Sequence, residues 1–365
     1  MDNQVFNRLF IIGNGFDLAH NYPTRYYHFR DWMEAKLREI YPDIECDHDG
    51  GIYADEYPQI PIAITGKHGD EIMDERQLLY LLMWLLLTNM KTDDDLNRFE
   101  EELYHLDLET VLYANDWGIE DAAKDKDGVI NPFHVDADLS ELASNIESAV
   151  QLLPKLFEKW IEDIEIIKPP KNLIKDADYL LPIGKIMDAE SLYLTFNYTE
   201  TLEKVYGVPG YLVDHIHGLR NRAKKFFSNK YNLPNTLGQI IVGHGVDIAR
   251  EFDKTYIETE NILEETISGL RKPIDSIIEE HSNFWSLIQN GRVKEIYSFG
   301  FSYSNVDIPY IKRIVLALKG GRDVTWYLNR FDDSWDEKDS PLTVNEGFEK
   351  IINSCGYQGK FGRYC

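Results

Sequence analysis

The stretch Leu9–Asp17 (LFIIGNGFD) decides the fold, because it joins a short apolar strand to a turn that contains two glycines. An apolar run closed by glycine is typical of a strand whose two faces are both buried. Glycines at such a turn let the backbone approach a phosphate, whose charge can rest on the amides of a following helix. The segment therefore predicts an α/β sheet with a ligand at the carboxyl ends of its strands.

Five more segments share this strand-like composition, and helical patterns separate many of them. The predicted strands are Leu9–Ile12, Leu192–Phe196, Leu212–Ile216, Gln239–Val242, Glu295–Phe299 and Val324–Leu328. The clearest predicted helices are Tyr26–Ile40, Arg76–Met90, Leu96–Leu106, Leu139–Ile166, Thr199–Tyr206, Phe252–Asn290 with a break at Pro273, Pro309–Leu318 and Asn345–Asn353. Strands that alternate with helices predict a Rossmann-like, mostly parallel sheet of about six strands.

A long, mainly helical gap separates the first two predicted strands. We therefore expect a large helical insertion after the first strand, at residues 32–188. The Rossmann-like nucleotide-binding core would then consist of residues 1–31 and 189–365.

Composition and charge exclude several classes of protein. The formal net charge of −25 opposes direct binding of nucleic acid, which depends on neutralising phosphates. The most apolar run, Leu78–Leu87, is about half the length of a membrane-spanning helix, which needs about 20 residues. Three widely spaced cysteines and a start without a secretory signal indicate a cytoplasmic protein. An oligomer is compatible with the sequence.

Polar residues stand at the ends of the other predicted strands. Asn197 follows Thr195 and offers a hydrogen-bond donor and an acceptor to the crevice beyond the sheet. His217, next to a glycine, would be a titratable group facing the pocket. Gly300 and Ser302 would line the same crevice.

Structural roles compete with ligand binding for several residues. Asp17 could be a helix N-cap, a ribose-hydroxyl acceptor or a metal ligand. Thr199 could cap the helix after Asn197, which itself could serve only the turn. Ser304 and Asp307 have the spacing of a capping box.

Two further sets of residues leave alternatives open. A basic cluster, either a solvated loop or a surface for phosphate or a partner, consists of Arg220, Arg222, Lys224, Lys225 and Lys230. Strand alternation would put His215 and His217 on one face, and a metal-dependent hydrolase or nuclease would also need His244 and Asp17 as ligands. We expect no metal, and the acidic charge argues against nucleic acid as substrate.

The motifs together resemble the AbiH family of bacteriophage abortive-infection proteins. The resemblance rests on Gly13-Asn14-Gly15-Phe16-Asp17 with His20, Pro23, Thr24 and Tyr27, on Thr195–Thr199, on His217-Gly218 and on Gly300-Phe301-Ser302. It implies a role in anti-phage defence, with a phage-derived or host protein as the trigger.

The order of the motifs is similar, more distantly, to the sirtuin-like NAD-binding fold. That resemblance implies catalytic roles for Asn197, which would position ribose and water, and for His217, which would act as base on the ribose hydroxyls. The resemblance implies a phosphate loop at Gly13 and Gly15 and places Ser302 near the adenosine half, although Asn14, Phe16 and Asp17 depart from the sirtuin loop. With the strand ends, the residues that we expect to bind the nucleotide are Gly13, Asn14, Gly15, Phe16, Asp17, Thr195, Gly300 and Ser302. The four-cysteine zinc module of sirtuins is absent, which argues against a protein deacylase.

Two functions remain open at this point. The first is hydrolysis of the N-glycosidic bond of NAD or a related nucleotide, which would deplete it during infection. The alternative is a non-catalytic nucleotide-sensing module that acts through a protein partner bound by the helical insertion.

Overall fold

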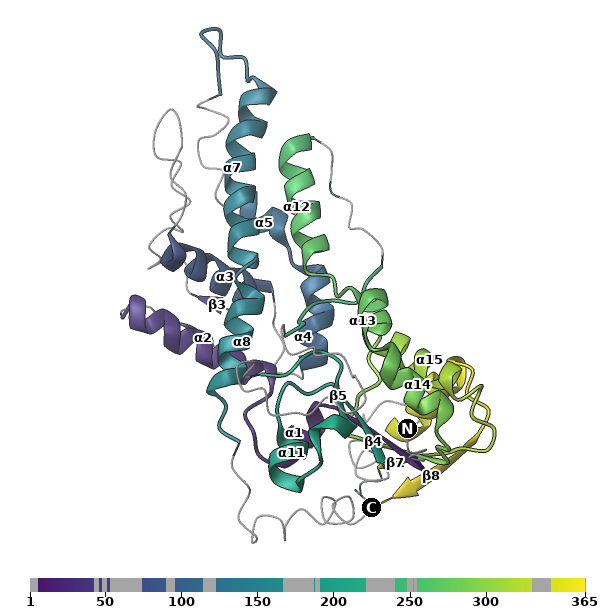
Figure 1. Cartoon of the computed structure of the whole chain (residues 1–365). Coiled ribbons are helices and arrows are strands. Elements are labelled where there is room, and N and C mark those ends of the chain that lie inside the picture. The colour runs from purple at the N-terminus through teal and green to yellow at the C-terminus, as the bar shows by residue number, and fades with distance from the viewer. Residues whose placement is uncertain are drawn as a thin grey trace. The chain divides into compact units, whose positions relative to one another are not determined.

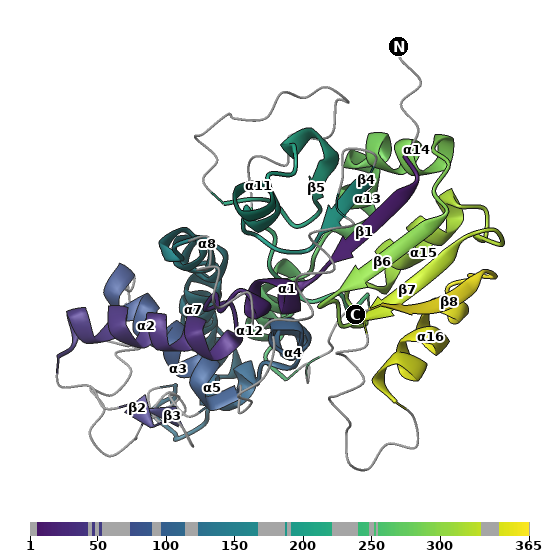
Figure 2. The same cartoon turned by 90° about the horizontal axis from the view of Figure 1, so that it is seen from below.

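The computed structural model describes residues 6–42, 46–47, 51–52, 74–89, 96–113, 123–166, 187, 191–220, 240–247, 252, 255–329 and 343–364. Its main sheet has six strands, all parallel, in the order β5-β4-β1-β6-β7-β8 (Figures 1 and 2). The strands are β1 Arg8–Ile12, β4 Ser191–Thr195, β5 Val213–His215, β6 Glu295–Phe299, β7 Thr325–Asn329 and β8 Lys360–Tyr364. Counted along the chain this order is that of a doubly wound Rossmann sheet, which confirms the predicted fold class.

The register brings the carboxyl ends of the three central strands to one level. Ile12 of β1 pairs with Thr195 of β4 on one side and with Phe299 of β6 on the other. Residues that follow these strands therefore meet at one edge of the sheet, where ligands bind in doubly wound folds.

The chain divides into two compact units. The first consists of Met1–Thr24, Ile161–Ile241 and Pro273–Cys365 and contains the sheet. The second consists of Arg25–Trp160 and Val242–Lys272 and is mainly helical. The domain division at residues 32–188 stays a prediction.

An aromatic ladder crosses one face of the sheet in the first unit. Phe10 stacks on Tyr193 at 5.1 Å and on Tyr297 at 5.2 Å between ring centroids, and Tyr297 stacks on Tyr327 at 4.7 Å. Cross-strand aromatic pairs of this kind fix the register of neighbouring strands. The helices of this unit are α1 Asn14–Ala19, α11 Thr201–Tyr206, α13 Ile274–Glu280, α14 Ser282–Asn290, α15 Ile308–Ala317 and α16 Val344–Ser354, with a 3-10 turn, η3, at Gly210–Leu212.

The second unit is built around two helices, α7 Pro132–Val150 and α12 Ile257–Gly269, which lie side by side (Figure 1). Buried residues of α7, among them Leu139, Leu142 and Ile146, repeat at helical spacing and form its inner face. The other elements are α2 Tyr26–Ile40, α3 Glu75–Asn89, α4 Leu96–Glu102, η2 Leu103–His105, α5 Leu108–Tyr113, α8 Leu153–Asp163, whose last residues belong to the first unit, β2 Cys46–Asp47 and β3 Gly51–Ile52. Within the described residues, no helix is long and apolar enough to cross a membrane.

Two predicted elements are wrong. Residues 240–242 form no strand, and residue 239 lies outside the described part of the chain; Ile241 only donates one backbone hydrogen bond to the His217 carbonyl. Residues 139–166 form two helices instead of one, with the chain leaving the first at Gln151 just before Pro154. The break at Pro273 is confirmed, since α12 ends before it and α13 begins after it.

Candidate functional site

The glycine turn after β1 is packed against the loop after β6. Gly13 N–H donates to the Phe299 carbonyl at 3.0 Å, and Gly15 N–H donates to the Gly300 carbonyl at 2.9 Å. A Cβ on Gly13 would lie 2.4 Å from Gly300 O, and one on Gly15 would lie 2.6 Å from Gly300 Cα. Both glycines are therefore required by this close backbone contact.

The other residues of the turn also have internal partners. The Phe16 amide donates to the Gly13 carbonyl at 3.0 Å, and the buried Phe16 ring packs edge-on against Phe299. The Asn14 side chain donates to the Thr24 carbonyl at 2.9 Å. The backbone N–H groups of Gly13, Gly15 and Phe16 thus already donate hydrogen bonds to backbone carbonyls. A contact between this turn and a diphosphate therefore stays a prediction.

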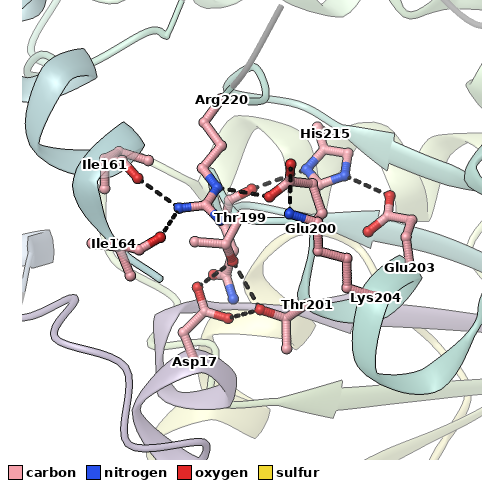
Figure 3. A network of polar contacts seen from close by, with 11 residues as sticks. Asp17, Ile161, Ile164, Thr199, Glu200, Thr201, Glu203, Lys204, His215 and Arg220 are labelled. Atoms are coloured by element: carbon pink, nitrogen blue, oxygen red, sulfur yellow. Dashed lines mark hydrogen bonds and ion pairs between the residues drawn. The ribbon is translucent and has the colours of Figure 1, made fainter. Parts of the chain in front are cut away.

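Asp17 is a buried carboxylate that joins two strand ends (Figure 3). It accepts hydrogen bonds from Thr199 Oγ1 at 2.6 Å and from Thr201 Oγ1 at 2.7 Å. The N-cap prediction for Asp17 is wrong, because Gly13 occupies the cap position of α1. Thr199 is not a cap either: Glu200 precedes α11, and the Thr199 hydroxyl is directed at Asp17 instead.

Burial raises the pKa of the Asp17 carboxyl from 3.8 to about 6, because the charged form is poorly solvated there. The Thr199 and Thr201 hydroxyls, the Asn197 amide and the positive charge of Arg220 all oppose this rise. Asp17 can therefore exchange a proton close to neutral pH.

Asn197 has an unsatisfied polar side chain. This side chain is buried, with 6% of the residue exposed, and neither Oδ1 nor Nδ2 makes a hydrogen bond of good geometry with a described residue, although the amide lies close enough to Asp17 to lower the pKa of that carboxyl. Its backbone is nevertheless fixed, because its N–H donates to Thr195 Oγ1 at 3.1 Å and its carbonyl accepts from His215 Nδ1 at 3.0 Å. A buried amide without partners is rare in folded proteins and marks a place for a ligand or water.

His217 lies in an aromatic environment beside a carboxylate. Its ring contacts Phe196 at 5.3 Å and Tyr310 at 5.5 Å between centroids, and it stacks on Tyr198 at 6.4 Å. His217 Nε2 is 3.8 Å from Asp307 Oδ1. The imidazole therefore lies against the segment that follows β4, where it contacts Phe196 and Tyr198, the two sequence neighbours of Asn197.

His215 has a different environment from His217. Strand β5 ends at His215, so the alternation that was expected to put both histidines on one face does not reach His217. His215 Nε2 is 2.9 Å from Glu203 Oε1, and its other ring nitrogen bonds the Asn197 carbonyl. Burial lowers the pKa of His215, but the Glu203 charge and these hydrogen bonds outweigh burial and the pKa is raised.

Two of the histidines proposed as metal ligands have other partners. His244 belongs to the second unit, where its Nε2 bonds the Ile267 carbonyl at 2.9 Å, and both nitrogens of His215 are occupied. Among the described residues, no three His, Cys, Asp or Glu side chains form a group that could hold a metal ion.

The loop after β6 supplies a residue that sequence reasoning misassigned. Asp307 itself occupies the cap position of α15 and makes no side-chain cap bond, so the capping box with Ser304 is wrong. Ser304 Oγ instead donates to Asp307 Oδ2 at 3.2 Å, while Oδ1 faces His217. Gly300 has a φ of 58°, and Ser302 is half-buried.

Arg220 is an internal residue and no part of a solvated loop. Its Nε donates to Glu200 Oε2 at 2.7 Å, and its Nη1 donates to the carbonyls of Ile161 at 2.9 Å and of Ile164 (Figure 3). Burial acts to raise the pKa of Glu200, but the Arg220 hydrogen bond and charge lower it below its usual value. The rest of the basic cluster, Arg222, Lys224, Lys225 and Lys230, lies outside the described residues.

A carboxylate, an amide and an imidazole thus follow successive strands at one edge of the sheet. Asp17 follows β1, Asn197 follows β4, His217 follows β5 and Asp307 lies beyond β6. These groups can accept hydrogen bonds from hydroxyls and donate hydrogen bonds to them, and the carboxylates and the imidazole can take up or release a proton. The sequence did not indicate three residues of the site, which are Asp307, Thr201 and Glu203. Only Asp307 had a recognisable signal, its position after a predicted strand.

A comparison with protein families agrees with the motifs. The family model described as bacteriophage abortive infection AbiH matches residues 9–329, which include all the strands except β8. No curated protein sequence matches the chain.

Proposed function

The chain belongs to the AbiH family of bacteriophage abortive-infection proteins, and on that premise we propose that its Rossmann-like unit hydrolyses the N-glycosidic bond of NAD or a related nucleotide. The family match supports the anti-phage role. In this proposal, loss of a common nucleotide would stop phage growth together with the infected cell.

The proposal rests on one observation, the unsatisfied side chain of Asn197. An unpaired buried amide costs about 1–3 kcal/mol, so it is retained only where it has a use. Its neighbour Asp17, and His217 after the adjacent strand, are groups that can hold ribose hydroxyls. Together they fit a ribose at the carboxyl ends of β1, β4 and β5.

The chemistry needs few protein groups. The bond between C1′ and the nicotinamide nitrogen breaks with its electron pair going to nicotinamide, which leaves neutral. The Asp17 carboxylate would stabilise the positive charge that develops at C1′. Water, positioned by Asn197, would then attack C1′ while His217 accepts its proton, giving ADP-ribose and nicotinamide.

The test is release of nicotinamide from NAD by the purified full chain, alone and with a lysate of phage-infected cells. We expect turnover in the wild type, and a loss of about 10²-fold or more in Asn197→Ala and His217→Ala. Asn353→Ala, on the exposed end of α16, is the matched control and should keep full activity.

Folding of the Asn197→Ala protein separates a lost site from a lost structure. Because neither side-chain atom of Asn197 makes a hydrogen bond of good geometry, we expect the change to lower the free energy of unfolding by no more than about 1 kcal/mol. NAD hydrolysis by the wild type that survives in Asn197→Ala and His217→Ala would refute the assignment. The absence of hydrolysis under both conditions would also refute it.

A second function, nucleotide sensing without turnover, is favoured by the partners of Asp17. Both carboxylate oxygens already accept hydrogen bonds from Thr199 and Thr201, so this group is committed to the structure of the site and less available for catalysis. A rise in melting temperature with a nucleotide, at constant nucleotide concentration over time, would select this function over hydrolysis.

A further inference from the structure

The N-terminal turns of α7 and α12 form one end of the second unit together with the turn at residues 124–130, and we call this end the α7–α12 tip. Asp136 of α7 accepts the backbone N–H of Glu258 at 3.1 Å and of Thr259 at 3.0 Å, both in the first turn of α12. The first turn of α12 therefore lies beside the second turn of α7 (Figure 1).

The tip exposes apolar side chains that the fold does not bury. Phe133 is 86% exposed, and Val129 and Ile257 are each 61% exposed. Among the described residues only one other large apolar side chain is exposed, Leu316 at 66% on α15. Three of these four exposed side chains lie in the tip, and we refer to these three as the patch; exposed apolar side chains that gather in one region mark interaction surfaces.

The backbone fixes the position of the patch. Asn131 is the N-cap of α7, and its side chain accepts the Phe133 N–H at 3.1 Å. The preceding turn is closed by Asp125, whose Oδ1 accepts the N–H of Asp127 at 2.8 Å and of Val129 at 2.9 Å. Phe133 and Val129 are therefore presented on ordered backbone, which lowers the entropy lost when a partner binds.

The charge around the patch indicates which kind of partner can bind it. Exposed or half-buried acidic residues at the tip outnumber the two lysines, Lys124 and Lys126; they are Asp125, Asp127, Asp136, Asp138 and Glu258. A second copy of this acidic chain, an anionic lipid surface or a nucleic acid would meet repulsion there. A protein surface with an apolar pocket and a rim of Lys and Arg is complementary in both respects.

We propose that the α7–α12 tip is the docking surface for a cationic protein partner, with Phe133 as the anchor that enters an apolar pocket of the partner. Aromatic anchors surrounded by polar rims carry most of the binding energy in such interfaces. The proposal does not depend on nucleotide chemistry in the first unit.

The test is selection of a displayed library of random short peptides on the immobilised full chain, followed by fluorescence polarisation with the recovered peptides. We expect peptides that combine aromatic or aliphatic residues with Lys and Arg, and binding that weakens as salt is raised. Phe133→Asp should weaken binding at least tenfold, and Asp127→Lys with Glu258→Lys should weaken it as well.

Leu316→Asp is the matched control, because it changes an equally exposed apolar residue in the other unit, and it should leave binding unchanged. Thermal unfolding checks that each variant folds. The proposal is overturned if no peptide is enriched, if the peptides are acidic, or if Phe133→Asp binds as the wild type does. It is also overturned if Phe133→Asp abolishes self-association in sedimentation or binding to anionic vesicles in place of peptide binding.

Discussion

Gly15 and Gly300 are in direct backbone contact across the ends of β1 and β6. The Gly15 N–H donates to the Gly300 carbonyl at 2.9 Å, and a Cβ on Gly300 would lie 2.5 Å from Gly15 Cα. In a doubly wound sheet the strand order reverses between these two strands, and the ligand crevice normally opens there. Here that position is closed by backbone, and the polar side chains Asp17 and Asn197 lie toward β4 instead.

Substitution of Gly300 by alanine should destabilise the first unit through this contact. Its φ of 58° alone costs an L-residue about 1–2 kcal/mol, and a Cβ 2.4 Å from the Phe16 nitrogen adds about 1–3 kcal/mol of overpacking. Gly207→Ala is the control, since its φ is 70° but no atom lies within 4 Å of the added Cβ. Urea unfolding should show a larger loss for Gly300→Ala, and equal losses would contradict the steric argument.

Asp17→Asn should change how stability depends on pH. The folded state raises the Asp17 pKa from 3.8 to about 6, so it holds the proton more tightly than the unfolded chain does. The stability contributed by that proton is present below pH 4 and is lost as pH rises to about 6, a change of about 3 kcal/mol.

The measurement for Asp17 is urea unfolding of both proteins between pH 4 and 7. The free energy of unfolding of the wild type minus that of Asp17→Asn should fall as pH rises through this range. Asp127→Asn, on the exposed turn before α7, is the control and should follow the wild type at every pH. A difference between wild type and Asp17→Asn that does not vary with pH would show that Asp17 has an ordinary pKa.

Arg220→Lys should destabilise the first unit although the charge is kept. A lysine ammonium cannot reach the Glu200 carboxylate and the carbonyls of Ile161 and Ile164 together, as the planar guanidinium does. The loss of one charge-assisted hydrogen bond costs about 1.5–3 kcal/mol. Arg322→Lys, an exposed arginine bonded to Gln358, should cost under about 0.5 kcal/mol in the same thermal unfolding assay. An equal loss of stability in Arg220→Lys and Arg322→Lys would mean that a lysine can replace Arg220 at this position.

Most of the sheet could be predicted from the sequence because its strands are short apolar runs with distinct ends. Five of the predicted strands overlap β1, β4, β5, β6 and β7, and α2 has the predicted bounds. Strand β8 was missed because Lys360–Tyr364 is half-exposed at the edge of the sheet and contains charges and a glycine. The segment Gln239–Val242 has strand-like composition, but its described residues, 240–242, form no strand, which composition alone cannot reveal.

The site was only partly predictable. Composition and position indicated Asn197 and His217, because polar residues after parallel strands converge at one edge. The partners of Asp17 could not be deduced, since the Thr199 and Thr201 hydroxyls come from a strand end 182 and 184 residues along the chain. The same holds for Asp307, which local spacing presented as a helix cap. The nucleotide, its cleavage and the protein trigger stay predictions.

The position of β1 at the centre of the sheet has a consequence for synthesis of the protein. Arg8 pairs with Ser191 on one side and with Glu295 on the other, so both neighbours of the earliest strand are translated much later. At about 5–20 residues per second, Glu295 follows roughly 15–60 seconds behind β1. During that time the apolar segment Leu9–Ile12 of the ribosome-bound chain has no strand to pair with. We therefore expect the yield of folded protein to depend on chaperones that cover this segment.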